Sequence, residues 1–218
     1  MPEIDMDMVY ITASTELIPI VGTEPTDYVT DIHGKLRDWD AGIGEEIIMG
    51  QFLFHILNPL AHSGGSAQSY FEVLDKYGLI KSYPALLNTM SSGKDNYQSQ
   101  KRNGNKLLLF DHLVISPEYR GRNLGLAVMT RLIYHFASDN NLVVIQPFPT
   151  QYSGSAHRDG EPEPSPYGDM LIEDATNKLV RHWAQIGFEQ VPGHWPYMVM
   201  SPTRNMPSTT ELLKNNSV

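Results

Sequence analysis

Two arginines and two glycines stand between two apolar runs in residues 113–129, LVISPEYRGRNLGLAVM. The run before the Ser-Pro turn is typical of a strand and the run after it has helical spacing, so the glycines fall where a helix begins. The first turn of a helix carries backbone N–H groups without intrahelical partners and a partial positive charge. Gly121 and Gly125 let a ligand approach that backbone, and Arg120 and Arg122 add charged donors. The segment therefore predicts an anion-binding site, for which a diphosphate is the expected ligand.

The spacing of these glycines does not fit the two common nucleotide-binding loops. A Walker A loop needs Gly-Lys-Ser/Thr, which is missing, and the dinucleotide fingerprint needs G-x-G-x-x-G. The alternative interpretation is a glycine-rich turn that only starts a helix.

Asp111 is the second candidate for chemistry, because it lies in the apolar run of residues 106–115. A carboxylate in a buried strand is unusual and would have a perturbed pKa, so Asp111 is a predicted general base. An aspartate bonded to loop backbone or to an arginine is the equal alternative. Asp111 lies two positions before Leu113 and is expected on the same face of the strand. His112 is expected to point to the other face, as a core histidine.

A proline-rich stretch at residues 147–168 also carries charge, with His157, Asp159 and Glu161 at alternate positions. These residue types can ligate a metal, but charged residues in a loop are more often solvated, so no metal is expected. A loop this long within a domain is typical of a lid or a binding segment.

Hydrophobic periodicity predicts the elements that must position these residues. The expected elements are a strand at 8–12, a hairpin at 28–57, helices at 66–80 and 84–88, a strand at 106–115, a helix at 124–136, a strand at 142–145, a helix at 172–186 and a hairpin at 188–200. The unit spanning 106–145 is a strand-helix-strand crossover, which requires a parallel strand pair. The predicted class is therefore mixed α/β, an α+β mixed sheet with flanking helices and a C-terminal hairpin.

The predicted domain organisation is simple. Residues 1–27 form an N-terminal extension, residues 28–200 a single domain, and residues 201–218 a polar tail that is expected to be loose.

Composition narrows the classes of function. Lys and Arg total 16 against 25 Asp and Glu, a formal charge of −9, which argues against binding to nucleic acid. The absence of cysteine excludes disulfides, thiolate nucleophiles and cysteine zinc sites, and it fits a reducing compartment. No apolar run approaches the roughly 20 residues of a membrane span, and the start MPEIDMDMVY does not look like a signal peptide, so a cytoplasmic protein is expected.

One pattern has a counterpart in a known family. Arg122-x-x-Gly125-x-Ala127, after VISPEYRG, resembles the coenzyme A signature of the GNAT superfamily of acyl-CoA-dependent N-acetyltransferases, Arg/Gln-x-x-Gly-x-Gly/Ala. The order of elements over residues 106–200, with a helix ending WAQIGFE, is similar to that family, and residues 45–90 resemble one mostly uncharacterised branch. The resemblance implies a GNAT-like fold, and acetyl-CoA or another short acyl-CoA as co-substrate.

The resemblance also implies a coenzyme site. Amides of the helix start would hold the diphosphate, the end of the preceding strand would pair with the pantetheine arm, and the later helix would contribute Thr176 or Asn177. The implied coenzyme-binding residues are Leu113, Val114, Ile115, Arg120, Gly121, Arg122, Asn123, Leu124, Gly125, Leu126, Ala127, Thr176 and Asn177. The amide of Val114, or that of Leu113, would hold the oxyanion.

The implied reaction is direct attack of an amine on the thioester. The glutamate that serves as base in some members corresponds here to Leu109, and the tyrosine that serves as acid corresponds to Trp183. Tyr152, Tyr167 and Tyr197 are alternatives for that acid. The negative charge favours a cationic acceptor, either a small-molecule amine or a lysine side chain, and a homodimer is compatible with the sequence. The rival interpretation is a non-catalytic acyl-CoA-binding sensor or interaction protein, which Trp183 favours.

Overall fold

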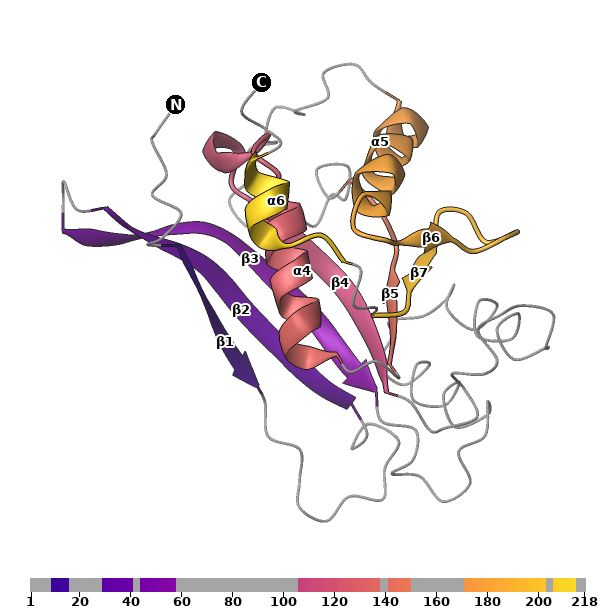
Figure 1. Ribbon diagram of the computed structural model, residues 1–218, viewed down its shortest axis with the longest axis horizontal. Helices are drawn as coiled ribbons and strands as arrows, with labels where there is room; N and C mark the ends of the chain where they lie inside the picture. Colours follow the sequence, from indigo (N-terminus) through magenta and orange to yellow (C-terminus); the bar gives the residue numbers. More distant parts are fainter. Residues whose placement is uncertain are drawn as a thin grey trace, which may run out of the picture.

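A computed structural model describes residues 9–15, 29–40, 44–57, 106–137, 141–149, 171–202 and 206–214. Their central feature is a seven-stranded mixed sheet with strand order β1-β2-β3-β4-β5-β7-β6 (Figure 1). Three α-helices accompany the sheet in this part of the chain, so the predicted mixed α/β class is confirmed.

The N-terminal half of the sheet is antiparallel. β2 (Val29–Asp40) and β3 (Glu45–Leu57) pair along their whole lengths and confirm the predicted hairpin. β1 (Tyr10–Thr15) pairs with β2, so the sheet includes part of the expected N-terminal extension. The predicted boundary at residues 27 and 28 therefore divides a continuous sheet.

The second half contains the predicted crossover. β4 (Leu107–Ile115) leads through a short 3-10 turn, Pro117–Tyr119, into α4 (Leu124–Phe136), and the chain returns as β5 (Leu142–Ile145). β4 and β5 are parallel, as predicted.

The remaining predicted elements follow in order. α5 (Ile172–Ala184) is followed by Gly187, whose φ of 101° suits glycine. β6 (Glu189–Gln190) and β7 (Met198–Met200) confirm the closing hairpin, and β7 pairs antiparallel with β5.

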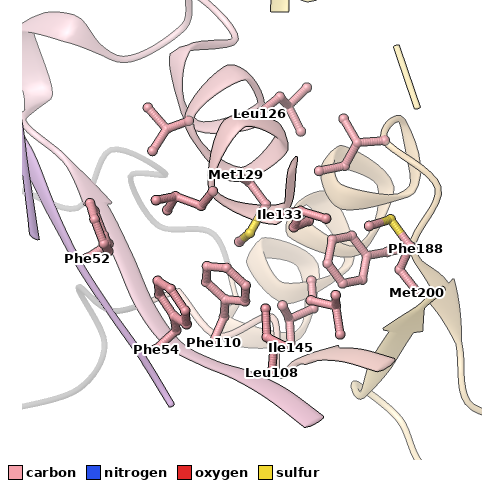
Figure 2. Packing of buried hydrophobic residues seen from close by; sticks show 14 of the residues in the cluster. Phe52, Phe54, Leu108, Phe110, Leu126, Met129, Ile133, Ile145, Phe188 and Met200 are labelled. Carbon is pink, nitrogen blue, oxygen red and sulfur yellow. The ribbon is translucent and has the colours of Figure 1, made fainter. Parts of the chain in front are cut away.

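The main core lies between the sheet and α4. Figure 2 shows aromatic side chains from β3 and β4 beneath α4 residues such as Met129 and Ile133. The rings of Phe54 and Phe110 are stacked with their centroids 4.7 Å apart. Because side chains alternate along a strand, Ile32, Phe54 and Phe110 define a helix face of the sheet, and their neighbours lie on the opposite face.

A third helix corrects one prediction. α6 (Thr209–Lys214) packs beside α4, with Met206 and Leu212 buried in the core (Figure 1). Residues 206–214, expected to be part of a loose tail, therefore belong to the folded unit.

The predicted helices at 66–80 and 84–88 and most of the proline-rich loop lie outside the described residues. Within the described ranges, no helix combines the length and apolar character needed to cross a bilayer.

Candidate functional site

The candidate site begins where two parallel strands separate. β4 and β5 form only four residue pairs, from Leu107 with Leu142 to Phe110 with Ile145. β4 then continues to Ile115, and over this stretch the described residues pair with it on the β3 side alone. We call this separation the fork, and it lies at the end of β4 that leads to α4 (Figure 1).

The sequence after β5 explains why the pairing stops. Residues 146–149 read Gln-Pro-Phe-Pro and have no regular structure. Proline fixes φ at about −65° and is rare within a sheet, so Pro147 and Pro149 end the regular strand after Ile145.

The peptide groups of β4 can be assigned to the two sides of the strand. The N–H of Ser116 donates to the Met49 carbonyl of β3 at 2.8 Å. A Cβ built on Gly50 of β3 would lie 2.5 Å from the Val114 carbonyl oxygen, so that group also faces β3. Since successive peptide groups alternate in direction, those of Leu113 and Ile115 face the fork. Of the two amides predicted to hold an oxyanion, that of Val114 therefore faces β3 and that of Leu113 faces the fork.

The start of α4 offers the predicted backbone donors. Ala127 donates its N–H to the Asn123 carbonyl at 3.0 Å, so this amide belongs to the helix ladder. For the amides of Leu124, Gly125 and Leu126, no acceptor is found among the residues that the structure describes. The side chains of Leu124 and Leu126 are buried in the core, so only their backbone can contact a ligand.

Gly125 is not required by the protein's own packing. A Cβ at this position would meet its nearest atoms, from Ile115, His182 and Trp183, at 3.9–4.0 Å, which is ordinary van der Waals distance. Its φ is not positive. The Gly125 position faces Ile115 of β4 and two residues of α5. Because glycine has no side chain, a ligand that enters between β4 and α5 can approach the helix backbone closely.

Side chains of the connecting turn make contacts within the fold, and two of its residues have left-handed backbone. Arg120 donates from Nε to the Ile115 carbonyl at 2.7 Å, which ties the turn to the end of β4. Gly121 has a φ of 77° and Asn123 a φ of 54°, both in the left-handed region. Asn123 also donates from Nδ2 to the Leu212 carbonyl of α6 at 3.0 Å. Arg122 is half-buried beside them.

The two α5 candidates differ in what their side chains contact. Thr176 is buried and donates from Oγ1 to the Ile172 carbonyl of its own helix at 2.8 Å, which does not suit the predicted coenzyme contact. Asn177 is half-buried and accepts a bond from Trp195 Nε1 at 3.4 Å. Asn177 is therefore the better of the two candidates.

The prediction that Asp111 is buried is wrong. The β3–β4 register passes from Phe54–Phe110 to Leu53–His112, so Asp111 is the extra residue of a β-bulge. Its side chain is 41% exposed, and its Oδ2 lies 2.9 Å from His112 Nδ1. The two side chains therefore do not point to opposite faces. The bulge also removes the simple alternation that placed Asp111 with Leu113.

Two groups of the site have shifted pKa values. The hydrogen bond from His112 lowers the pKa of Asp111; the electrostatic influence of His112 and His55 adds to that effect, and burial opposes it. Burial lowers the pKa of His182, so its imidazole is neutral at pH 7. His182 was not identified from the sequence, where only its neighbour Trp183 gave a signal.

Aromatic residues border the site at two places. Trp183 lies against the first turn of α4, as its distance from the Gly125 position indicates. Tyr197 lies beyond the end of β5, on the opposite face of the sheet, and donates from its hydroxyl to Gln146 Oε1 at 3.2 Å. Tyr152 and Tyr167 are outside the described residues.

Within the described ranges, no cluster of three or more metal-binding side chains is present; His157, Asp159 and Glu161 fall outside these ranges. Comparison of the chain with known protein families, curated proteins and solved structures finds no match.

Proposed function

We propose that this protein is an N-acyltransferase with a GNAT-type fold, which transfers an acetyl or other short acyl group from acyl-CoA to an amine. The fork carries the proposal: β4 keeps peptide groups directed to the side on which its pairing with β5 has ended, and the same end of β4 leads into α4. The signature-like residues Arg122, Gly125 and Ala127 lie at that junction.

The donors on the two elements fit the two parts of coenzyme A. The amides of Leu124, Gly125 and Leu126 suit a diphosphate, because a helix start combines N–H donors with partial positive charge. The peptide groups of Leu113 and Ile115 suit the amides of the pantetheine arm, which would lie beside β4 as a neighbouring strand would.

The chemistry requires a free amine and a stabilised oxyanion. An alkyl amine with a pKa near 10.4 is mostly protonated at pH 7, and freeing it costs roughly 4–5 kcal/mol. A general base that is positioned beside the amine raises the rate of the reaction by a factor of about 10²–10⁴. The Leu113 amide is the donor for the oxyanion, because a donor fixed in a strand needs no reorganisation during the reaction.

The acceptor is proposed to be cationic. The formal charge of −9 attracts polyamines, other cationic small molecules and lysine side chains.

A non-catalytic acyl-CoA-binding protein is the second candidate function. Trp183 supports it, since this residue occupies the position of the family's acid tyrosine and has no hydroxyl. Thiol release from acetyl-CoA, measured with a library of amines, separates the two candidates.

Calorimetric titration with acetyl-CoA tests the proposed site. We expect binding that Gly125→Glu abolishes, because a carboxylate at the helix start would repel and displace the diphosphate. Tyr134→Glu is the matched control, since Tyr134 is an exposed residue of the same helix and the substitution adds the same charge. Lack of binding by the unmodified protein, or equal loss in both variants, would contradict the proposal.

A further inference from the structure

His112 and Asp111 occupy a distinctive position on β4. They are the first two residues after Phe110, which makes the last pair with β5. Their side chains therefore lie at the point where the strands separate. His112 pairs with Leu53, two residues from His55 on β3, so it lies on the face opposite α4.

The contact between the two side chains defines the histidine tautomer. Asp111 Oδ2 lies 2.9 Å from His112 Nδ1, and the lowered pKa of Asp111 keeps this carboxyl ionised at neutral pH. An ionised carboxylate accepts but cannot donate, so Nδ1 carries the proton and Nε2 presents its lone pair. The His112 side chain is 31% exposed, which leaves it within reach of a substrate.

Other titratable groups on this face are arranged differently. His55 is only 4% exposed, and its Nδ1 lies 2.7 Å from Asp31 of β2. The histidine of this second histidine-carboxylate pair is closed to solvent, although His55 contributes electrostatically to the lowered pKa of Asp111. Beyond the end of β5, Tyr197 contacts Gln146. Among the described histidines on this face, His33 is exposed but lies on β2, two strands away, and His112 is the partly exposed imidazole at the fork.

We infer that His112 is the general base for the amine acceptor and that Asp111 is a positioning residue that holds its imidazole. This inference rests on the proposed function and deepens it. It also reverses the predicted roles, in which Asp111 was the base and His112 a core residue.

The bonds, electrons and protons of the acyl transfer can all be accounted for with these groups. His112 Nε2 takes a proton from the acceptor ammonium, and the freed nitrogen lone pair attacks the thioester carbonyl carbon. The C–N bond forms, the C–S bond breaks, and its electron pair leaves with the sulfur. Of the three ammonium protons, one stays on the amide nitrogen, one passes through His112 to solvent, and one ends on the thiol.

The test uses acetyl-CoA with a panel of primary amines headed by spermidine, and it measures coenzyme binding and thiol release separately. We expect His112→Gln to lower kcat/KM for the amine by about 10²–10⁴-fold, with the Kd for acetyl-CoA unchanged. Added imidazole should partly restore the rate of His112→Ala, which a purely structural role would not allow. His135→Gln is the control, because His135 is an exposed histidine on α4.

Asp111→Asn gives an independent readout. The substitution should lower kcat for the amine and leave the Kd for acetyl-CoA unchanged, because the amide no longer holds the imidazole as the tautomer with its proton on Nδ1. A folded His112→Gln variant that transfers at the original rate would overturn the inference and leave the proposed function intact. Binding of acetyl-CoA without thiol release for any amine would overturn it as well. Absence of coenzyme binding would instead remove the proposed function.

Discussion

The two halves of β4 have different surroundings. Residues 107–110 are paired on both sides and fully buried, and every one of them is apolar. Residues 112–115 pair with β3, and the described part of the chain supplies no strand on their other side; this half is partly exposed and includes His112 and the bulge residue Asp111. Where the sheet satisfies its own backbone, the strand contributes stability. Where β5 ends, the same strand presents backbone donors and titratable side chains that are not used in pairing with β5.

The largest expected effect tests the first half of this comparison. Phe110→Ala should lower the free energy of unfolding by about 3–5 kcal/mol, because it leaves a cavity beside the stacked ring of Phe54. Urea unfolding measures the loss. Val114→Ala, in the half-buried part of β4, should cost less than half as much. Equal losses at the two positions would remove the distinction between the halves.

A second substitution separates folding from binding at the fork. Gly125→Ala should raise the stability of α4 by up to about 1 kcal/mol, because alanine favours a helix and its Cβ has room. The same methyl group should weaken acetyl-CoA binding at least tenfold, since it stands where the diphosphate would approach the backbone. Thermal unfolding and calorimetry on one sample measure both effects. Destabilisation with unchanged binding would mean that the glycine serves the fold.

The smallest expected effect concerns His182 beside α4. Burial lowers its pKa from the ordinary value of 6.5, so between the folded and unfolded values only the unfolded chain takes up the proton. The contribution of neutral His182 to the free energy of unfolding is therefore fully present above about pH 6.5. It falls as the pH drops, until the pKa of the folded state is passed. His182→Gln should reduce the pH dependence of unfolding in this window by at most one proton. An unchanged slope would show that His182 is well solvated.

Periodicity predicted the elements around the fork because each has a complete pattern. α4 has apolar residues at every third or fourth position, and β5 is a short apolar run bounded by polar and proline residues. The parallel pairing of β4 and β5 then followed from the crossover between them.

The details that decide the chemistry were not visible in the same pattern. The bulge at Asp111 depends on the register with β3, a pairing between segments far apart in the sequence. Alternation along β4 alone therefore gave the wrong surroundings for Asp111. The contact of Asp111 with His112, and the choice between the Val114 and Leu113 amides, both depend on this register.

The two terminal segments were assigned wrongly for a related reason: the strand predicted at 8–12 was placed in an extension outside the domain, and no helix was predicted in residues 201–218. β1 has little apolar character and belongs to the sheet through its backbone pairing with β2. α6 is a single short helix anchored by Met206 and Leu212 in a mostly polar segment. Few apolar residues in a polar stretch give a weak periodic signal, although Met206 and Leu212 are buried in the core.

Amide hydrogen exchange with and without acetyl-CoA tests the central claim most directly. We predict slower exchange on coenzyme addition at Leu113, at Ile115 and at the amides of residues 124–126, with no change in the paired strands β2 and β3. Exchange at the fork that stays the same when acetyl-CoA is added in excess, or slowing confined to other elements, would contradict the account.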